Sequence, residues 1–220
     1  MRRVRLAVLA IAGILSVGCE MTVDNTLTIR ADGSGTLVSA ISYDRASRDV
    51  LGDPERFVTD IVEANVGFLD GVRITEVSLG EEEGRSHVDL TIEAEGPEAL
   101  DQLVAEAFIG SFTRLGGDRF ALLLVGEDWS REAGPTPPDL GGTTTVVVDG
   151  AISDVDGGQR VADGRVRWEQ FGQDDLEAVV ELSGGGPFSR IGGRAGWLFP
   201  LALLGIVGIG AVGLVVARRR

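Results

Sequence analysis

Few side chains in this sequence have the chemistry of a catalytic or metal-binding group. The chain holds one histidine, His87, and one cysteine, Cys19, so an intramolecular disulfide and a thiolate metal cluster are both impossible. The motifs of serine hydrolases, zinc proteases and phosphate-binding loops are absent. Asp154, Asp156 and Gly157 resemble part of a calcium loop, but its closing glutamate is missing. We therefore expect no enzyme, no metal and no cofactor, with a site of dispersed carboxylates as the alternative.

The single cysteine follows an apolar segment near the N-terminus. A short basic stretch precedes the uncharged residues 6–15, which at about ten residues are too short to span a bilayer and indicate a signal peptide over residues 1–18. The Gly18–Cys19 junction resembles the lipobox of bacterial lipoproteins, in which the cysteine thiol receives a diacylglyceryl group, although Ser16 stands where leucine is usual. We predict lipidation of Cys19; the alternative is an incidental cysteine.

A second apolar segment lies near the C-terminus. Residues 195–217 carry no charge and are followed by three arginines, residues 218–220. A helix of this length covers the bilayer core, and the arginine cluster favours a cytoplasmic basic tail. We predict a transmembrane helix, preceded by a glycine-rich stalk over residues 184–194. The alternative is a buried core helix. The expected location is the cell membrane, single-pass, with an N-terminal lipid anchor and an extracytoplasmic domain.

The predicted extracytoplasmic domain, residues 19–183, is acidic. All 34 acidic residues of the chain lie between residues 20 and 194, together with 14 of the 20 arginines, which gives this stretch a formal charge of about −20. Such a charge repels nucleic acid, so we exclude nucleic acid as a partner. An acidic surface of this kind could instead recruit a basic protein.

Alternation of apolar and polar residues predicts most of the secondary structure of this domain. Helices are predicted to begin at Pro54 and at Pro97, because each proline stands at a first helical position. We predict α+β: a mostly antiparallel sheet with two helices, plus one C-terminal transmembrane helix. The predicted strands and hairpins cover residues 21–30, 36–43, 72–94, 120–125, 143–153, 165–171 and 176–182.

The order of these segments resembles the LppM-type lipoproteins of actinobacteria. The closest stretches are residues 19–41, where the cysteine leads into a strand, an Asp-containing turn and a returning strand, and residues 143–182, which end in an alternating strand. The resemblance implies an extracytoplasmic domain that binds membrane lipid or glycolipid in an apolar cavity between sheet and helices.

Such a cavity would be lined by the apolar stripes of the two helices, although a packed core is the ordinary interpretation of such stripes. The alternative function is an envelope protein-interaction domain that recruits a partner through its acidic surface. The candidate lining residues are Phe57, Ile61, Leu100, Leu103, Val104 and Phe108.

Overall fold

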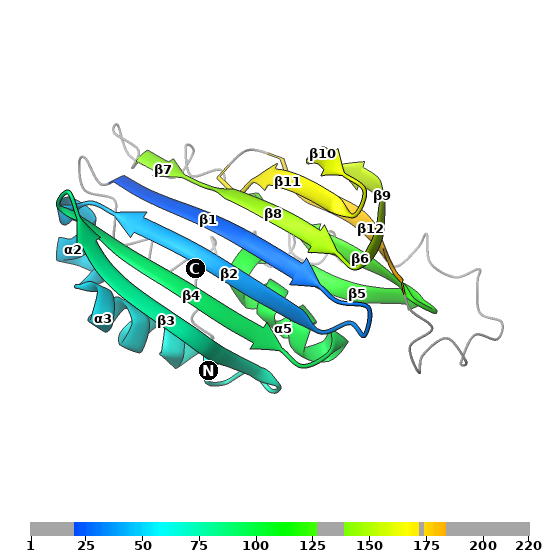
Figure 1. Ribbon diagram of the computed structural model, residues 1–220, viewed down its shortest axis with the longest axis horizontal. Helices are drawn as coiled ribbons and strands as arrows, with labels where there is room; N and C mark the ends of the chain where they lie inside the picture. Colours follow the sequence, from blue (N-terminus) through cyan, green and yellow to red (C-terminus); the bar gives the residue numbers. More distant parts are fainter. Residues whose placement is uncertain (1–19, 127–138, 172–173, 184–220) are drawn as a thin grey trace, which may run out of the picture. The chain divides into compact units, whose positions relative to one another are not determined.

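The computed structural model describes residues 20–126, 139–171 and 174–183 of the chain. The chain divides into two compact units, Met1–Ser189 and Arg190–Arg220, and all of the described residues belong to the first. Within this unit the strands form two β-sheets, and helices lie against the larger sheet (Figure 1).

The larger sheet has eight strands in the order β10-β11-β8-β1-β2-β4-β3, and β7 pairs with β1 off this path. The central strand β1 is antiparallel to β2 but parallel to β7 and β8. The bounds of these strands are β1 Glu20–Ile29, β2 Gly35–Tyr43, β3 Val72–Glu82, β4 Arg85–Ala94, β7 Asp139–Gly141, β8 Thr143–Val148, β10 Gln159–Ala162 and β11 Arg165–Glu169.

One face of this sheet is apolar and the other is polar. On β1 the side chains of Leu27 and Ile29 are fully buried, whereas Thr26 between Asn25 and Leu27 is exposed. The register places Leu27 beside Leu37 of β2, so the buried rows of adjacent strands continue one another. The apolar face is therefore the inner face of the domain, and it carries the core.

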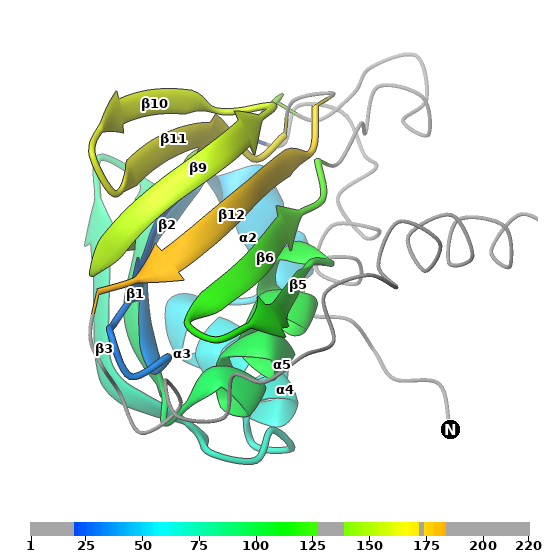
Figure 2. The same cartoon turned by 90° about the vertical axis from the view of Figure 1, so that its right-hand side faces the viewer.

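The second sheet contains β5 (Ser111–Gly116), β6 (Arg119–Leu124), β12 (Leu176–Leu182) and β9 (Gly150–Asp156), in that order. The chain leaves the larger sheet after β8 through Asp149 and enters the second sheet as β9. It returns to the larger sheet as β10 after Gly157 and Gly158. Two tight connections thus place consecutive strands in different sheets, and Figure 2 shows β9 and β12 crossing in front of the larger sheet.

A short helix, α2 (Arg45–Leu51), follows β2 and was not predicted. Its N-cap is Asp44, whose carboxylate accepts hydrogen bonds from the backbone N–H of Ser47 at 2.8 Å and from its hydroxyl at 2.7 Å. Burial acts to raise the pKa of Asp44, but these hydrogen bonds outweigh it and hold the pKa below the usual value. The signal for this helix was the Asp44-x-x-Ser47 spacing.

The helix predicted to begin at Pro54 consists of three consecutive pieces. These are α3 (Pro54–Phe57), the π-helix η1 (Val58–Glu63) and α4 (Ala64–Val66). Asp53 caps the first piece by accepting a hydrogen bond from the Arg56 N–H at 3.0 Å, as expected from the Asp-Pro start. Phe68 continues the helical spacing of Phe57 and Ile61 in the sequence, but the helical stretch ends before it, and its side chain is 86% exposed.

The last helix, α5 (Pro97–Phe108), begins at the predicted proline. Its apolar stripe packs toward the inner face of the larger sheet, and the helices lie on that face in both ribbon views (Figures 1 and 2). The buried residues of α5 are Ala99, Leu100, Leu103, Val104 and Phe108.

The predicted fold class, one mostly antiparallel sheet with two helices and a transmembrane helix, is wrong. The strands form two sheets, the central strand of the larger one has parallel partners, and the helical residues fall into more than two elements. The cause is that alternation identifies a strand and its buried face but not the sheet that the strand joins. No helix among the described residues is long and apolar enough to cross a membrane; the predicted span, residues 195–217, lies outside them.

Candidate functional site: an apolar pocket between sheet and helices

A partly open pocket of about 110 Å³ lies between the inner face of the larger sheet and the helices. Strands β1, β2 and β4 form its floor, and η1, α4 and α5 form its walls. The floor is mostly apolar, with Met21, Leu37, Ile41, Leu90 and Ile92, and the walls carry Val62, Val66, Leu103 and Ala107.

A polar cluster interrupts this apolar floor. The hydroxyl of Ser39 donates to Asn25 Oδ1 at 2.6 Å, and Asn25 Nδ2 donates to Gln170 Oε1 at 2.8 Å and to Thr144 Oγ1 at 3.5 Å. All four residues are buried. Among the described residues no buried side-chain nitrogen or oxygen lacks a hydrogen-bond partner. The cluster therefore satisfies itself and does not require a polar ligand.

The pocket lining also includes a carboxylate and residues from the segments that follow β11 and α4. Glu106 of α5 is the one ionisable residue among its lining residues, and Gln170 and Phe171 line it after β11. Leu69 also contributes to the lining, and the neighbouring Phe68 is the most exposed large apolar side chain of the described residues. The pocket thus has an apolar interior, one partly exposed carboxylate in its lining, Glu106, and an exposed aromatic ring, Phe68, beside the lining residue Leu69.

The volume sets what the pocket can hold in this conformation. An engineered protein cavity of about 150 Å³ admits benzene, whereas pockets for drug-sized ligands have about 300–1,000 Å³. A pocket of about 110 Å³ therefore accepts a short apolar group, such as the end of an acyl chain, but not a whole lipid. A longer chain would require the helical walls to move.

The structure places the predicted lining residues in two different environments. Leu103 lies on the pocket wall and is 2% exposed, whereas Leu100 and Val104 are fully buried. Phe108 and Phe57 are also buried away from the pocket, and the Phe57 ring lies 5.8 Å from that of Tyr43. The six candidates are thus brought to one side of the sheet, but Leu103 alone of the five whose side chains are described lines the pocket.

Two of the predicted site residues lack a described side chain. Ile61 lies within η1, but its side chain is not among those described. Cys19 lies outside the described residues altogether, as do the signal peptide, the stalk and the basic tail. Lipidation at Cys19 stays a prediction.

The residues that the sequence analysis missed are those of the sheet. Helical stripes were considered as cavity walls, but the floor comes from β1, β2 and β4. A signal was present in β1, where Asn25 occupies the inward position between Val23 and Leu27. A polar residue on an otherwise apolar strand face requires a buried partner, and Ser39 of β2, the cross-strand neighbour of Asn25, supplies one.

The acidic turns and the histidine do not form a metal centre in the described part of the chain. No group of three or more His, Cys, Asp or Glu side chains there is arranged to hold a metal ion. Asp156 instead accepts a hydrogen bond from the Gly157 N–H at 3.0 Å, which is an ordinary turn contact. His87 lies on β4, paired with Ser42 and Gly80 of the neighbouring strands.

Comparison with known proteins identifies the fold. No family model matches the chain, and no curated protein matches it significantly. Among solved structures, it is similar to the folded domain of LppM from Mycobacterium tuberculosis, determined by NMR. The two are 17% identical with a TM-score of 0.55, over 80% of this chain and 96% of that one. The chain therefore has an LppM-type fold, which confirms the resemblance seen in the sequence at the level of fold.

Two enzymes share weaker similarity. A two-domain M1 zinc metallopeptidase bound to L-tryptophan is 10% identical with a TM-score of 0.34, and the M1 zinc metallopeptidase of Deinococcus radiodurans is 9% identical with a TM-score of 0.31. Each match covers 76% of this chain and 43% of the metallopeptidase chain. Similarity at this level carries no argument about activity.

Proposed function

We propose that this chain is a lipid-anchored protein of the bacterial cell envelope whose extracytoplasmic domain binds lipid or glycolipid. The single observation that carries the proposal is the apolar pocket, because it leaves an open space against the inner face of the sheet, where a packed core would be filled. The lipobox-like junction at Cys19 supports the envelope location, and the LppM-type fold is compatible with it. The protein acts by binding, without catalysis.

In this proposal the end of an acyl chain enters the pocket between β2 and α5. Burial of apolar surface favours entry by roughly 25 cal/mol per Å². The head group stays outside, near Glu106, the partly exposed lining residue of α5. Phe68, exposed beside the lining residue Leu69, contacts the lipid surface from which the chain is taken.

The helical wall is the element that moves to admit a longer chain. The part that moves consists of η1 and α4, and η1 has π-helical hydrogen bonding, which occurs mostly as single-turn insertions in helices and is frequent at functional sites. Val62 and Val66 of this stretch line the pocket directly. A shift of the wall away from the sheet therefore enlarges the space without breaking the strand ladder.

Filling the pocket should weaken lipid binding. Ala107 lines the pocket on α5, whereas Ala105 on the same helix is exposed. We expect Ala107→Trp to weaken binding of a fluorescent fatty acid by about tenfold or more, corresponding to about 1.4 kcal/mol or more, because the indole occupies the space that the chain would take. Titration of the detergent-solubilised protein measures this affinity, and native mass spectrometry of the same sample detects lipid that co-purifies.

The control is Ala105→Trp, which adds the same side chain to the solvent face of α5. It should bind the fatty acid like the unmodified protein. If the unmodified protein neither binds the probe nor carries co-purified lipid, the lipid-binding proposal fails. Equal losses in both variants would place the ligand elsewhere than the pocket.

The lipid anchor is tested separately. Cells that express the protein are fed an alkyne-tagged fatty acid, and the protein is isolated and labelled. We expect incorporation into the unmodified chain and none into Cys19→Ala, because Cys19 is the single thiol of the sequence. A Ser16→Ala variant is the matched control for the junction and should still label. Equal labelling of the Cys19→Ala variant would disprove acylation at this residue.

A second candidate function is recruitment of a basic partner protein. The net charge of −14 favours it. Lipid binding is preferred as the main proposal because it has a defined pocket.

A further inference from the structure

The free edge of the larger sheet is a long strand with one unpaired side. β3 is the last strand in the sheet order and pairs with β4 alone. It has 11 residues, and most of them are exposed. In the described part of the chain no element pairs with its outer edge, so its backbone groups there are available to another strand.

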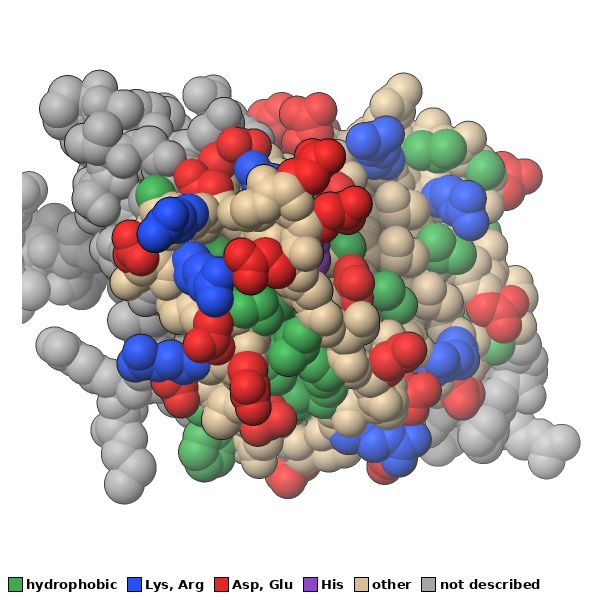
Figure 3. Space-filling view, turned by 60° about the vertical axis from the view of Figure 1, so that its left-hand side comes forward, with side chains coloured by type: hydrophobic (Ala, Val, Ile, Leu, Met, Phe, Trp, Pro, Cys, Tyr) green, Lys and Arg blue, Asp and Glu red, His purple; other side chains and the backbone are tan. Residues whose placement is uncertain are grey.

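An apolar row runs along the inner side of this edge. Val77 pairs with Leu90 and Leu79 pairs with Val88, so both share the apolar face of the sheet. They are nevertheless 40% and 44% exposed. Figure 3 shows apolar side chains lying in a hollow in the middle of this face, with acidic side chains on both sides of it.

The outer side of the same edge is acidic. The strand pairing is irregular between Ile74 and Glu76. After it, Glu76 and Glu82 of β3 lie beside Thr91 and Arg85 of β4, on the outer face of the sheet. These two carboxylates, together with Glu83 in the turn, form no ion pair among the described residues. Glu81 is paired with Arg48 at 3.1 Å. The edge from Glu76 to Glu83 therefore has unneutralised negative charge.

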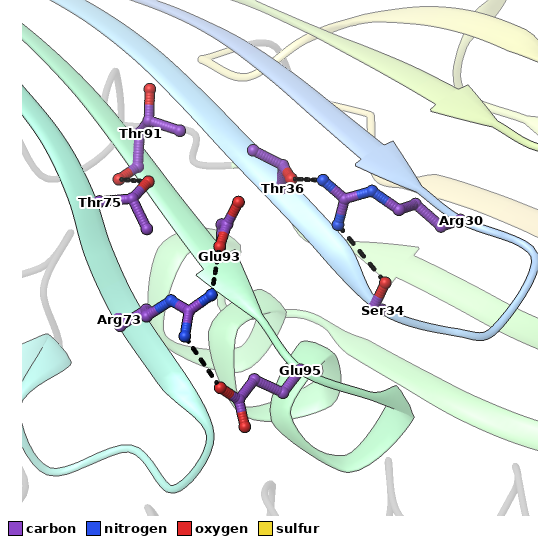
Figure 4. A network of polar contacts seen from close by, with 8 residues as sticks. All are labelled: Arg30, Ser34, Thr36, Arg73, Thr75, Thr91, Glu93 and Glu95. Atoms are coloured by element: carbon purple, nitrogen blue, oxygen red, sulfur yellow. Dashed lines mark hydrogen bonds and ion pairs between the residues drawn. The ribbon is translucent and has the colours of Figure 1, made fainter.

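The arginines around this edge form ion pairs with other carboxylates. Arg85, the cross-strand neighbour of Glu82, is paired with Glu20 at 2.9 Å. Arg73 donates to Glu93 at 2.8 Å and to Glu95 at 3.2 Å, both on the outer side (Figure 4). These ion pairs raise the pKa of Arg73, the hydrogen bond to Glu93 first. Arg73 also lies on the other side of the pairing irregularity between Ile74 and Glu76, at the far end of β3 from Glu82. It therefore does not neutralise Glu82.

We propose that the edge of β3 from Glu76 to Glu82 binds an extended segment of a partner protein in which apolar residues alternate with basic ones. The backbone of the segment pairs with β3 as an additional strand. Its apolar side chains lie beside Val77 and Leu79, and its basic side chains lie on the opposite face beside Glu76 and Glu82. The two-residue period of a strand makes this alternation the matching pattern.

The negative charge of this edge disfavours a second copy of this chain as the strand that binds there. Two β3 edges would bring two copies of Glu76 and two of Glu82 to one side of a joint sheet, where like charges repel. The net charge of −14 adds to this repulsion. A basic segment neutralises the same carboxylates. No residue of β3 lines the apolar pocket, so this binding holds whether or not the pocket takes lipid.

The test uses the full chain in detergent and a fluorescent nine-residue peptide of alternating valine and lysine. We expect binding, measured by fluorescence anisotropy, that weakens with added salt. Two further peptides carry N-methyl groups on one or the other alternating set of backbone amides. One of them should lose binding by about tenfold, because strand pairing uses one set of amides, whereas the other should bind like the parent. A peptide with glutamate in place of lysine should not bind.

The matched pair of variants is Leu79→Lys and Val38→Lys. Both residues are 44% exposed, but Val38 lies on the opposite face, on β2. We expect Leu79→Lys to weaken peptide binding by about tenfold, because an inward-facing charge blocks an edge, and Val38→Lys to leave it unchanged. Fatty-acid binding, measured in the same samples, should be unaffected by either variant, which separates this proposal from that of the pocket.

Four results would overturn the proposal. The first is no binding of the unmodified valine–lysine peptide. The second is equal binding of both N-methylated peptides, and the third is equal effects of Leu79→Lys and Val38→Lys. The fourth is a dimer, seen by sedimentation, that dissociates in Leu79→Lys, because this would make a second copy the occupant of the edge.

Discussion

Replacing Gly142 by alanine is expected to destabilise the protein by about 3–5 kcal/mol. Gly142 joins β7 to β8, and a Cβ atom there would lie 2.0 Å from the carbonyl oxygen of Val23 in the central strand β1. Its φ of +156° adds strain for any L side chain. Such strain costs about 1–3 kcal/mol and overpacking a further 1–3 kcal/mol. Urea unfolding followed by circular dichroism measures the loss.

The control for this prediction is Gly116→Ala at the end of β5. Gly116 has a φ of +140°, but a Cβ atom there would meet nothing within 4 Å. It should therefore show the backbone cost alone, about 1–3 kcal/mol. If both variants lose the same stability, the close approach of Gly142 to β1 adds no cost of its own, and the larger loss predicted for Gly142→Ala is wrong.

The second large effect concerns two leucines one turn apart on α5. Leu100 is fully buried, and it packs so closely on β2 that a Cβ atom on Gly35 would lie 2.6 Å from Leu100 Cδ1. Leu103 faces the pocket, where neighbours are already missing on one side. We expect Leu100→Ala to lower the free energy of unfolding by about 4–5 kcal/mol and Leu103→Ala by about 2–3 kcal/mol, the two ends of the usual range for such changes.

Urea unfolding of both variants measures this difference, and fatty-acid binding supplies a second comparison. Leu103→Ala widens the pocket and should change the affinity for the probe. Leu100→Ala should leave this affinity unchanged when binding is measured without urea. Equal and large losses of stability in both variants, with no probe binding, would mean that the space beside Leu103 is filled in solution.

Local sequence signals were sufficient to predict where several elements begin and which face they bury. Asp53 and Pro54 start a helix because a carboxylate cap and a proline at the first position suit its free N–H groups. The alternation of Leu27 and Ile29 with threonines predicted the buried face of β1. These features depend on residues a few positions apart, and tertiary contacts did not change them.

Partners far apart in the sequence were not predictable by the same means. Asn25 pairs with Thr144 in a parallel register, across 119 residues, and nothing in the alternation of either strand selects this partner. Residues 143–153 were predicted as one strand, but the chain changes sheets within them at Asp149, between β8 and β9, and changes back after Gly157. A period of two identifies a face, but the choice of neighbouring strand depends on packing of the whole core.

The pocket is the part of the candidate site that only the tertiary structure decided. The sequence by itself determined that α5 has an apolar stripe, and it could not distinguish a lining residue such as Leu103 from a packed one such as Leu100. The difference arises because the helical stretch with Val62 and Val66 and the strand face with Asn25 and Ser39 do not close completely around Leu103. Unfilled space is a property of several elements together, so no single segment encodes it.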